Sequence, residues 1–187
     1  MIHSVRFTAV LDTNVIYPID TRDLLLWFAH YDLYTPKWSH DIMKELTKVM
    51  LAKGITQDKI NAQIERINGA FPDALVKNYE PLIKNLSLRD PNDCHVLAAA
   101  IKANANIIVT NNLKDFPLEY LAEFGLTSTS ADDFITDIID LNQKIAVEAF
   151  NEMVNNRRNP DLDCYQVLDR LRQRGLNQSA DYLHSLV

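Results

Sequence analysis

The sequence predicts an α/β protein in which helices cover both faces of a parallel sheet, followed by a helical extension. Two apolar runs, Phe7–Leu11 and Asn106–Thr110, are typical of buried strands, and each ends in polar residues. Between these runs, apolar residues recur at helical spacing, and strands that alternate with amphipathic helices favour a parallel sheet. From Ser130 onward only helical patterns remain. We therefore expect a core domain of residues 1–130 and a helical extension of residues 131–187.

The first strand ends at Asp12, and Thr21 is expected to cap the helix that follows it. Leu33–Thr35 is expected to form a short second strand, which Pro36 stops because proline cannot donate to a sheet ladder. Ser39 is expected to cap the next helix and Thr56 to open the one after it, and both helices carry apolar residues every three or four positions.

The second half of the core begins with a less regular stretch, in which residues 82–83 are interpreted as a strand or an extended connection. Asp90–Asp93 then opens a strongly apolar helix, and the strand 106–110 follows it. Pro117 starts a short helix, and residues 126–129 are expected to form a last strand. In the extension, Ser130 begins a long apolar stripe from residue 138 to residue 153, Asn159-Pro160 breaks the chain, and two further helices follow.

Composition narrows the class of protein. The chain has 187 residues, of which 47% are hydrophobic and 24% charged, as in ordinary globular domains. It has no apolar run of about 18–20 residues and no signal-peptide pattern, so we expect no membrane segment. Its two cysteines, Cys94 and Cys164, are too few for a disulfide framework, and we interpret them as reduced packing residues of a cytoplasmic protein. A net charge of −6 argues against a protein that coats DNA broadly. The basic groups Arg157-Arg158 and Arg170/Arg172/Arg174 remain available for a polyanion or an acidic partner, or form solvated helix faces.

Four acidic residues are candidates for one site: a carboxylate at the end of a strand and three others that could meet it. Asp12 follows the first strand directly, at the edge of the sheet where α/β proteins bind ligands. The other three are Glu45 on the Ser39 helix, Asp93 at the start of the apolar helix, and Asp115 shortly after the strand 106–110. Each has a purely structural alternative: Asp12, Asp93 and Asp115 could cap helices or form turns, and Glu45 could pair with Lys44 or Lys48.

Carboxylates without Cys or His are the ligands that Mg²⁺ and Mn²⁺ prefer. An ion held in this way activates water and neutralises charge on a phosphoryl oxygen, which is the chemistry of phosphodiester hydrolysis. Neutral side chains suited to positioning water or phosphate flank the acids, and each is also a common turn residue: Thr13, Asn14, Thr110, Asn111 and Asn112.

Four segments, in this order and spacing, strongly resemble a PIN domain, and within that family the ribonuclease toxins of VapBC-type toxin–antitoxin pairs. They are Leu11-Asp12-Thr13-Asn14-Val15, Lys44-Glu45-Leu46, residues 90–100 and residues 108–117. The resemblance covers about the first 130 residues. It implies a three-layer α/β/α sandwich with a mainly parallel sheet, and a Mg²⁺- or Mn²⁺-dependent endoribonuclease that leaves a 5′-phosphate and a 3′-hydroxyl. It also implies an RNA substrate, a cognate antitoxin that blocks the site, and the homodimer that such toxins often form.

The resemblance matches Asp12, Glu45 and Asp93 to the first three acids of the family, and departs from it at the fourth. Many relatives carry Asp where this chain has Asn112, and Asp115 is expected to take over that role. Two other classes of function remain as alternatives. A non-catalytic PIN-like binding module would be favoured by loss of an early acid, and none is lost. A haloacid dehalogenase-type phosphatase needs a second Asp at position 14, where this chain has Asn14.

Overall fold

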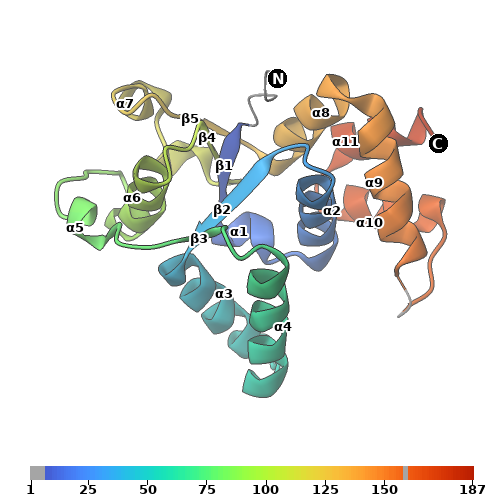
Figure 1. The fold of residues 1–187 in the computed structure, drawn as a ribbon, viewed down its shortest axis with the longest axis horizontal. Coiled ribbons are helices and arrows are strands. Elements are labelled where there is room, and N and C mark those ends of the chain that lie inside the picture. Colours follow the sequence, from blue (N-terminus) through green and yellow to red (C-terminus); the bar gives the residue numbers. More distant parts are fainter. Residues whose placement is uncertain (1–6, 158–159) are drawn as a thin grey trace. The chain divides into compact units, whose positions relative to one another are not determined.

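The computed structural model describes residues 7–157 and 160–187, and it confirms the predicted α/β class. Five parallel strands form one sheet in the order β3-β2-β1-β4-β5 (Figure 1). Their bounds are β1 Thr8–Leu11, β2 Thr35–Ser39, β3 Leu75–Val76, β4 Ile107–Val109 and β5 Thr127–Thr129. β1 lies at the centre, with Val10 opposite both Lys37 of β2 and Ile108 of β4.

The described chain divides into two compact units. One unit, here called the sheet unit, comprises residues 7–17 and 35–129 and contains all five strands. The other, the helical unit, comprises residues 18–34, 130–157 and 160–187. Each unit is described by itself.

The helices of the sheet unit place the ends of its strands. The apolar helix α6 (Cys94–Lys102) packs against β1, β2 and β4, and its residues 96–100 are fully buried. Helix α3 (His40–Ala52) contacts β2, the short α1 (Thr13–Ile16) and α4 (Gln57–Ala70), and α3 and α4 lie side by side in Figure 1. The remaining elements are α5 Glu80–Ile83, α7 Leu118–Ala122 and the 3₁₀ turns η1 Pro91–Asp93 and η2 Leu113–Asp115.

The helical unit contains α2 (Ile19–His30) and the four C-terminal helices. These are α8 Ala131–Leu141, α9 Gln143–Asn155, α10 Cys164–Gln173 and α11 Asn177–His184. The long predicted stripe is divided at Asn142, whose extended backbone ends α8 and whose side chain accepts from the Ile145 N–H to cap α9. Of the predicted chain break, Asn159 lies outside the described residues, as does Arg158 of the basic groups.

Several predicted helix starts are confirmed by hydrogen bonds. Ser39 Oγ accepts from the Ile42 N–H at 3.2 Å, and Ser130 Oγ accepts from the Asp133 N–H at 3.1 Å. Asp90 Oδ1 accepts from the Asn92 N–H at 2.9 Å, so this carboxylate caps η1. Such caps satisfy backbone donors that a helix leaves unpaired, which makes them readable from sequence.

The predicted position of the second strand is wrong, because β2 runs from Thr35 to Ser39 with Pro36 inside it. Along β2 the N–H groups point alternately to either side: Thr35 N donates to Phe7 O and Trp38 N donates to Ala74 O, both at 3.0 Å. The nitrogen of Pro36 therefore faces the β3 side, where β3 begins only opposite Trp38. The missing proline donor leaves no ladder bond unmade.

Two smaller predictions are also wrong. Residues 82–83 lie in α5, and the edge strand is β3, formed by Leu75–Val76. Thr21 does not cap its helix, because α2 begins at Ile19 after Pro18 and Thr21 is buried inside its first turn. A proline that presets the backbone before a helix competes here with the Thr cap signal.

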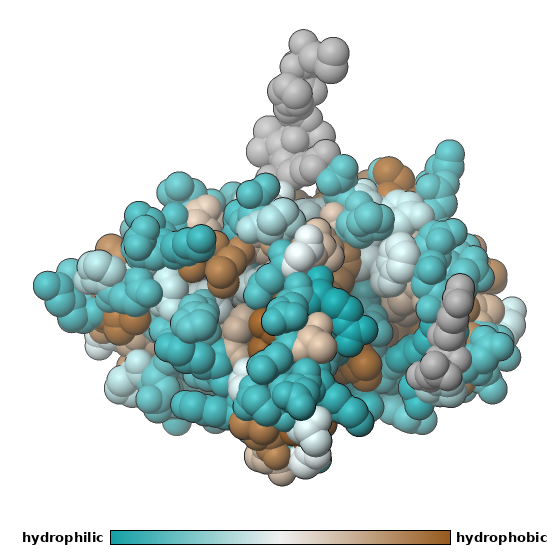
Figure 2. All heavy atoms as spheres, turned by 60° about the horizontal axis from the view of Figure 1, so that its bottom comes forward, coloured by the Kyte–Doolittle hydropathy of each residue, from teal (hydrophilic) through white to brown (hydrophobic). Residues whose placement is uncertain are grey.

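On the face shown in Figure 2, hydrophilic side chains cover most of the surface and apolar ones appear in small groups between them. Two of the most exposed apolar side chains are Leu118 at 58% and Leu141 at 70%, and they belong to different units. No helix in the described ranges is long and apolar enough to cross a membrane.

Candidate functional site

Asp12 lies at the carboxyl end of the central strand and is 5% exposed. Its backbone N–H donates to Val109 O of β4 at 3.0 Å, which fixes the residue at the junction of the two strands. Its Oδ1 accepts from the Thr13 N–H at 2.6 Å, so Asp12 does cap α1. Its Oδ2 accepts from Asn14 Nδ2 at 2.6 Å and from Thr110 Oγ1 at 2.7 Å. Burial outweighs these donors and raises the pKa of the Asp12 carboxyl above its usual range.

Thr110 and Asn14 join the ends of β1 and β4 around that carboxylate. Thr110 is fully buried, and its Oγ1 accepts from Asn14 Nδ2 at 3.0 Å and from the Asn112 N–H at 3.1 Å. Asn14 Oδ1 in turn accepts from the Asn111 N–H at 2.9 Å. The polar residues that follow the two strands thus form one network that holds Asp12 in position.

Glu45 reaches the same region from α3. Its Oε2 accepts from Thr13 Oγ1 at 2.7 Å, and its Oε1 lies 2.9 Å from His95 Nε2 of α6. Burial acts to raise the pKa of Glu45, but the hydrogen bonds from His95 and Thr13 outweigh it and hold the pKa below its usual range. The alternative pairing with Lys44 is wrong, because Lys44 pairs with Asp41 at 3.0 Å.

Asp93 is the least satisfied of these acids. It occupies the N-cap position of α6, yet its side chain makes no capping hydrogen bond, and its Oδ2 is buried without a partner among the described residues. Burial, followed by the charges of Asp12, Asp90, Asp115 and Glu45, raises the pKa of Asp93 to about 6. The capping alternative therefore does not explain this carboxylate.

These three acids line one cavity of about 330 Å³, together with Thr13, Asn14, Tyr17 and Val49. They come from three separate elements: the end of β1, the middle of α3 and the start of α6. Tyr17 and Val49 were not predicted, since nothing in their own sequence neighbourhoods distinguishes them from packing residues.

Asp115 lies at the end of η2 and is 7% exposed. Its Oδ2 accepts a hydrogen bond from Asn112 Nδ2, and Arg89 Nε lies 3.9 Å from its Oδ1. Its charge is among those that raise the pKa of Asp93. Asp115 and Asn112, the two candidates for the fourth position, are therefore joined to each other beside the three acids.

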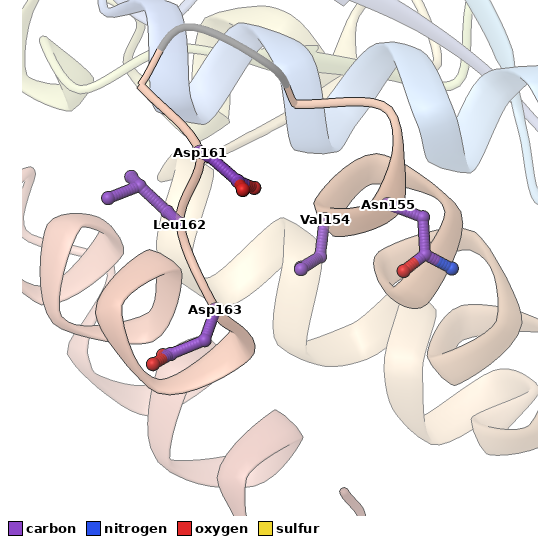
Figure 3. Close-up of a pocket in the computed structure, with 5 residues that line it drawn as sticks. All are labelled: Val154, Asn155, Asp161, Leu162 and Asp163. Atoms are coloured by element: carbon purple, nitrogen blue, oxygen red, sulfur yellow. The ribbon is translucent and has the colours of Figure 1, made fainter.

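A second cavity, of about 390 Å³, lies in the helical unit between the end of α9 and the segment that leads into α10 (Figure 3). Its two carboxylates, Asp161 and Asp163, point in different directions in Figure 3. Asp163 is already used as the cap of α10, since its Oδ1 accepts from the Gln166 N–H at 2.8 Å. This cavity lacks the convergent acids of the first.

Comparison with known families identifies the family of this chain. The PIN domain family model matches residues 8–114, which is more than half of the chain. The protein belongs to the PIN domain family. A second family model, the VapC50 C-terminal domain, matches residues 131–185.

A curated relative extends this result. The chain is 35% identical over 82 residues to a Mycobacterium tuberculosis protein named "Putative ribonuclease VapC50". The alignment covers 44% of this chain and 48% of the relative, so the similarity spans about half the length of each protein. No solved structure matches the chain.

The PIN domain acids are suited to a hard divalent cation, although they are not arranged as a preformed metal cluster. Among residues 7–157 and 160–187, no three His, Cys, Asp or Glu side chains form a group that could hold a metal as they stand. The donor set is nevertheless all oxygen, as Mg²⁺ and Mn²⁺ require. The buried, unpartnered Oδ2 of Asp93 and its raised pKa are what a carboxylate without its counter-charge shows.

His95, which was not predicted as a site residue, contacts one of these acids. It is 9% exposed, and its hydrogen bond with Glu45 raises its pKa against the opposing effect of burial. Its Nδ1 is buried and has no partner within the described part of the chain. The contact between His95 and Glu45 joins residues 50 positions apart, so it leaves no local sequence signal. The sequence around His95 shows only that Asp93 and His95 both lie near the start of α6.

Proposed function

We propose that this PIN-domain protein is a metal-dependent endoribonuclease and the toxin of a type II toxin–antitoxin pair. The observation that carries the proposal is the cavity in which Asp12, Glu45 and Asp93 meet, with one buried carboxylate oxygen that has no partner among the described residues. The family membership and the relative named as a ribonuclease support the same activity.

In this proposal Asp12, Glu45 and Asp93 hold Mg²⁺ or Mn²⁺, and Asp115 is the fourth acid of the metal site. When bound, such an ion neutralises charge on a phosphoryl oxygen and makes water a stronger nucleophile. The reaction adds water across the bond between phosphorus and O3′, so that one product carries a 5′-phosphate and the other takes up a proton as a 3′-hydroxyl.

The protein's own residues hold this site in place. Thr110 and Asn14 donate to Asp12 Oδ2, and Thr13 donates to Glu45, so the carboxylates keep their positions despite mutual repulsion. Asp93, whose pKa is about 6, is mostly ionised above neutral pH and then ready to bind a cation. Thr13, Asn14 and Asn112 also offer groups that we expect to position water or phosphate, whereas the fully buried hydroxyl of Thr110 already makes three hydrogen bonds and holds Asp12 instead.

We further propose that the protein acts in the cytoplasm, that a cognate antitoxin blocks the site, and that two copies form a dimer. The C-terminal match to the VapC50 C-terminal domain supports the toxin assignment. The function of residues 131–187 as an extension that packs on the core, dimerises or receives an antitoxin helix stays a prediction.

The decisive experiment incubates the purified full chain with a structured RNA pool in Mg²⁺, Mn²⁺ or EDTA, and compares it with Asp12→Ala. Glu65→Gln, an exposed acid on α4, is the matched control for loss of one negative charge. We expect cleavage by the wild type and Glu65→Gln only with metal, and none by Asp12→Ala. If Asp12→Ala cleaves as well as the wild type, the proposal fails; if the wild type binds RNA but never cleaves it, the non-catalytic binding module is the better explanation.

A further inference from the structure

Three arginines of the helical unit surround a single buried carboxylate. Asp20, in the first turn of α2, has a side chain that is only 1% exposed. Arg157 donates to its Oδ1, Arg170 Nη1 lies 3.8 Å from the same oxygen, and Arg174 Nε lies 3.3 Å from Oδ2. These four residues, here called the Asp20 cluster, join α2 to the segment after α9 and to the end of α10.

The donors of this cluster far exceed its acceptors. Each guanidinium carries five N–H groups, whereas one carboxylate offers about four acceptor positions. Arg157 has a side chain that is only 9% exposed, and its Nη1 is buried without a hydrogen-bond partner in the described ranges. An unpaired buried donor on a charged group is costly, so the cluster is incomplete as it stands.

The cluster also carries surplus positive charge. Three arginines against Asp20 leave a net charge of +2, and the neighbouring pair Arg22 and Asp23 adds nothing to the sum. Arg172, on the same helix α10, is by contrast an arginine whose charge is neutralised by salt bridges. Its guanidinium lies 2.9 Å from both Asp169 and Asp181.

The surplus is open to solvent. The side chains of Arg170 and Arg174 are 39% and 50% exposed, while Asp20 is covered, so an approaching anion meets guanidinium groups first. We propose that Arg157, Arg170 and Arg174 form a phosphate-binding site that holds a backbone phosphate of RNA. The planar fork of a guanidinium matches phosphate oxygens, and a chain of net charge −6 needs local cationic sites to bind a polyanion. That the phosphate belongs to RNA depends on the proposed function.

The test measures binding separately from cleavage. A fluorescent single-stranded RNA is titrated by anisotropy with the full chain carrying Asp12→Asn, in EDTA, at several salt concentrations. The variant Arg170→Gln/Arg174→Gln is compared with Arg172→Gln/Lys144→Gln, which removes the same charge from α10 and the exposed face of α9. Loss of one phosphate contact is expected to weaken binding about fivefold at 0.1 M salt and to lower the salt slope by about 0.7. The control is expected to change affinity less than twofold.

Inorganic phosphate and polyglutamate serve as competing ligands in the same assay. We expect phosphate to compete more strongly than chloride of equal ionic strength, and only when Arg170 and Arg174 are present. Equal losses in both double variants, or no loss in either, would overturn the proposal. Competition by polyglutamate without any effect of the arginines on RNA would assign the cluster to an acidic protein segment. If the double variant does not fold, Arg174→Gln alone, at the most exposed of the three arginines, is measured in its place.

The outcome is distinct from that of the nuclease test. A protein that binds RNA through these arginines but does not cleave it would contradict the proposed function and leave this site intact. A protein that cleaves RNA, and whose Arg170→Gln/Arg174→Gln variant binds RNA with unchanged affinity, would support the proposed function and contradict the phosphate-binding site.

Discussion

Replacing Asp93 with Asn is expected to stabilise the metal-free fold while abolishing nuclease activity. Asp93 lies close to four other acids, and its Oδ2 is buried without a partner in the described structure. Its ionised form is therefore disfavoured in the folded protein. Asparagine keeps the shape of the side chain and removes the charge.

The size and the pH range of the effect follow from the raised pKa of Asp93. A rise from the ordinary 3.8 to about 6 corresponds to about 3 kcal/mol. Because the side chain is only half-buried, solvent screening reduces the expected gain to about 1–2 kcal/mol. The folded state binds the Asp93 proton more tightly than the unfolded state does. The stability that this proton contributes is therefore fully present below pH 3.8 and is lost as the pH rises through about 6. The advantage of Asp93→Asn should be absent near pH 4, grow between pH 4 and 6, and stay constant above pH 7.

Urea denaturation in EDTA, followed from pH 4 to pH 8, measures this difference, with Glu65→Gln as the control for loss of one charge. In the presence of Mg²⁺ the stability advantage of Asp93→Asn over the wild type should shrink or reverse. A ligand that binds only the folded state stabilises it, and the variant lacks one of the carboxylates that would bind the ion. An advantage that does not depend on pH, or a variant that is less stable at pH 8, would refute the electrostatic account of Asp93.

Three further predictions test neighbouring contacts. Asp115→Asn should weaken metal-dependent cleavage more than Asn112→Ala does, and the opposite order in initial rates would assign the fourth position to Asn112. Thr110→Val should lower the free energy of unfolding by about 1–3 kcal/mol, since it removes a buried donor to Asp12 and leaves two amide N–H groups without their acceptor; equal urea midpoints would contradict this. Asp20→Asn should cost about 3 kcal/mol by leaving three arginines without their counter-charge, and an unchanged melting temperature would show that solvent already screens them.

The parts of the fold that the sequence predicts correctly are those with local physical causes. The runs that became β1 and β4 are apolar because parallel strands are buried on both faces, and they are visible for that reason. The caps Ser39 and Ser130 are equally local, since each serves a backbone donor three residues away. Strand β2 was misplaced because the effect of Pro36 depends on where a non-local neighbour, β3, begins. That information is absent from the residues around position 36.

The candidate site shows the same division. Its acids could be proposed from position alone, because Asp12 follows a buried strand and Asp93 opens a buried helix. Their partners could not, since the contact of His95 with Glu45 joins α6 to α3, and that of Thr110 with Asp12 joins two strands 98 positions apart. The hydrogen bonds from His95 and Thr13 hold the pKa of Glu45 below its usual range, whereas burial raises the pKa values of Asp12 and Asp93.

Hydrogen-bond support, rather than the direction of the pKa shift, separates two roles within one cavity. Glu45 and Asp12 are held by donors from Thr13, Asn14, Thr110 and His95, and they keep their positions whether or not a cation is present. No residue in the described part of the chain supports Asp93 Oδ2 in this way, so its charge is the one that a cation would relieve. Metal binding should therefore release protons mainly from Asp93, and the apparent affinity for Mg²⁺ should rise most steeply near pH 6. Asp93, whose charge destabilises the metal-free fold, is thus the residue whose charge most favours cation binding at this site.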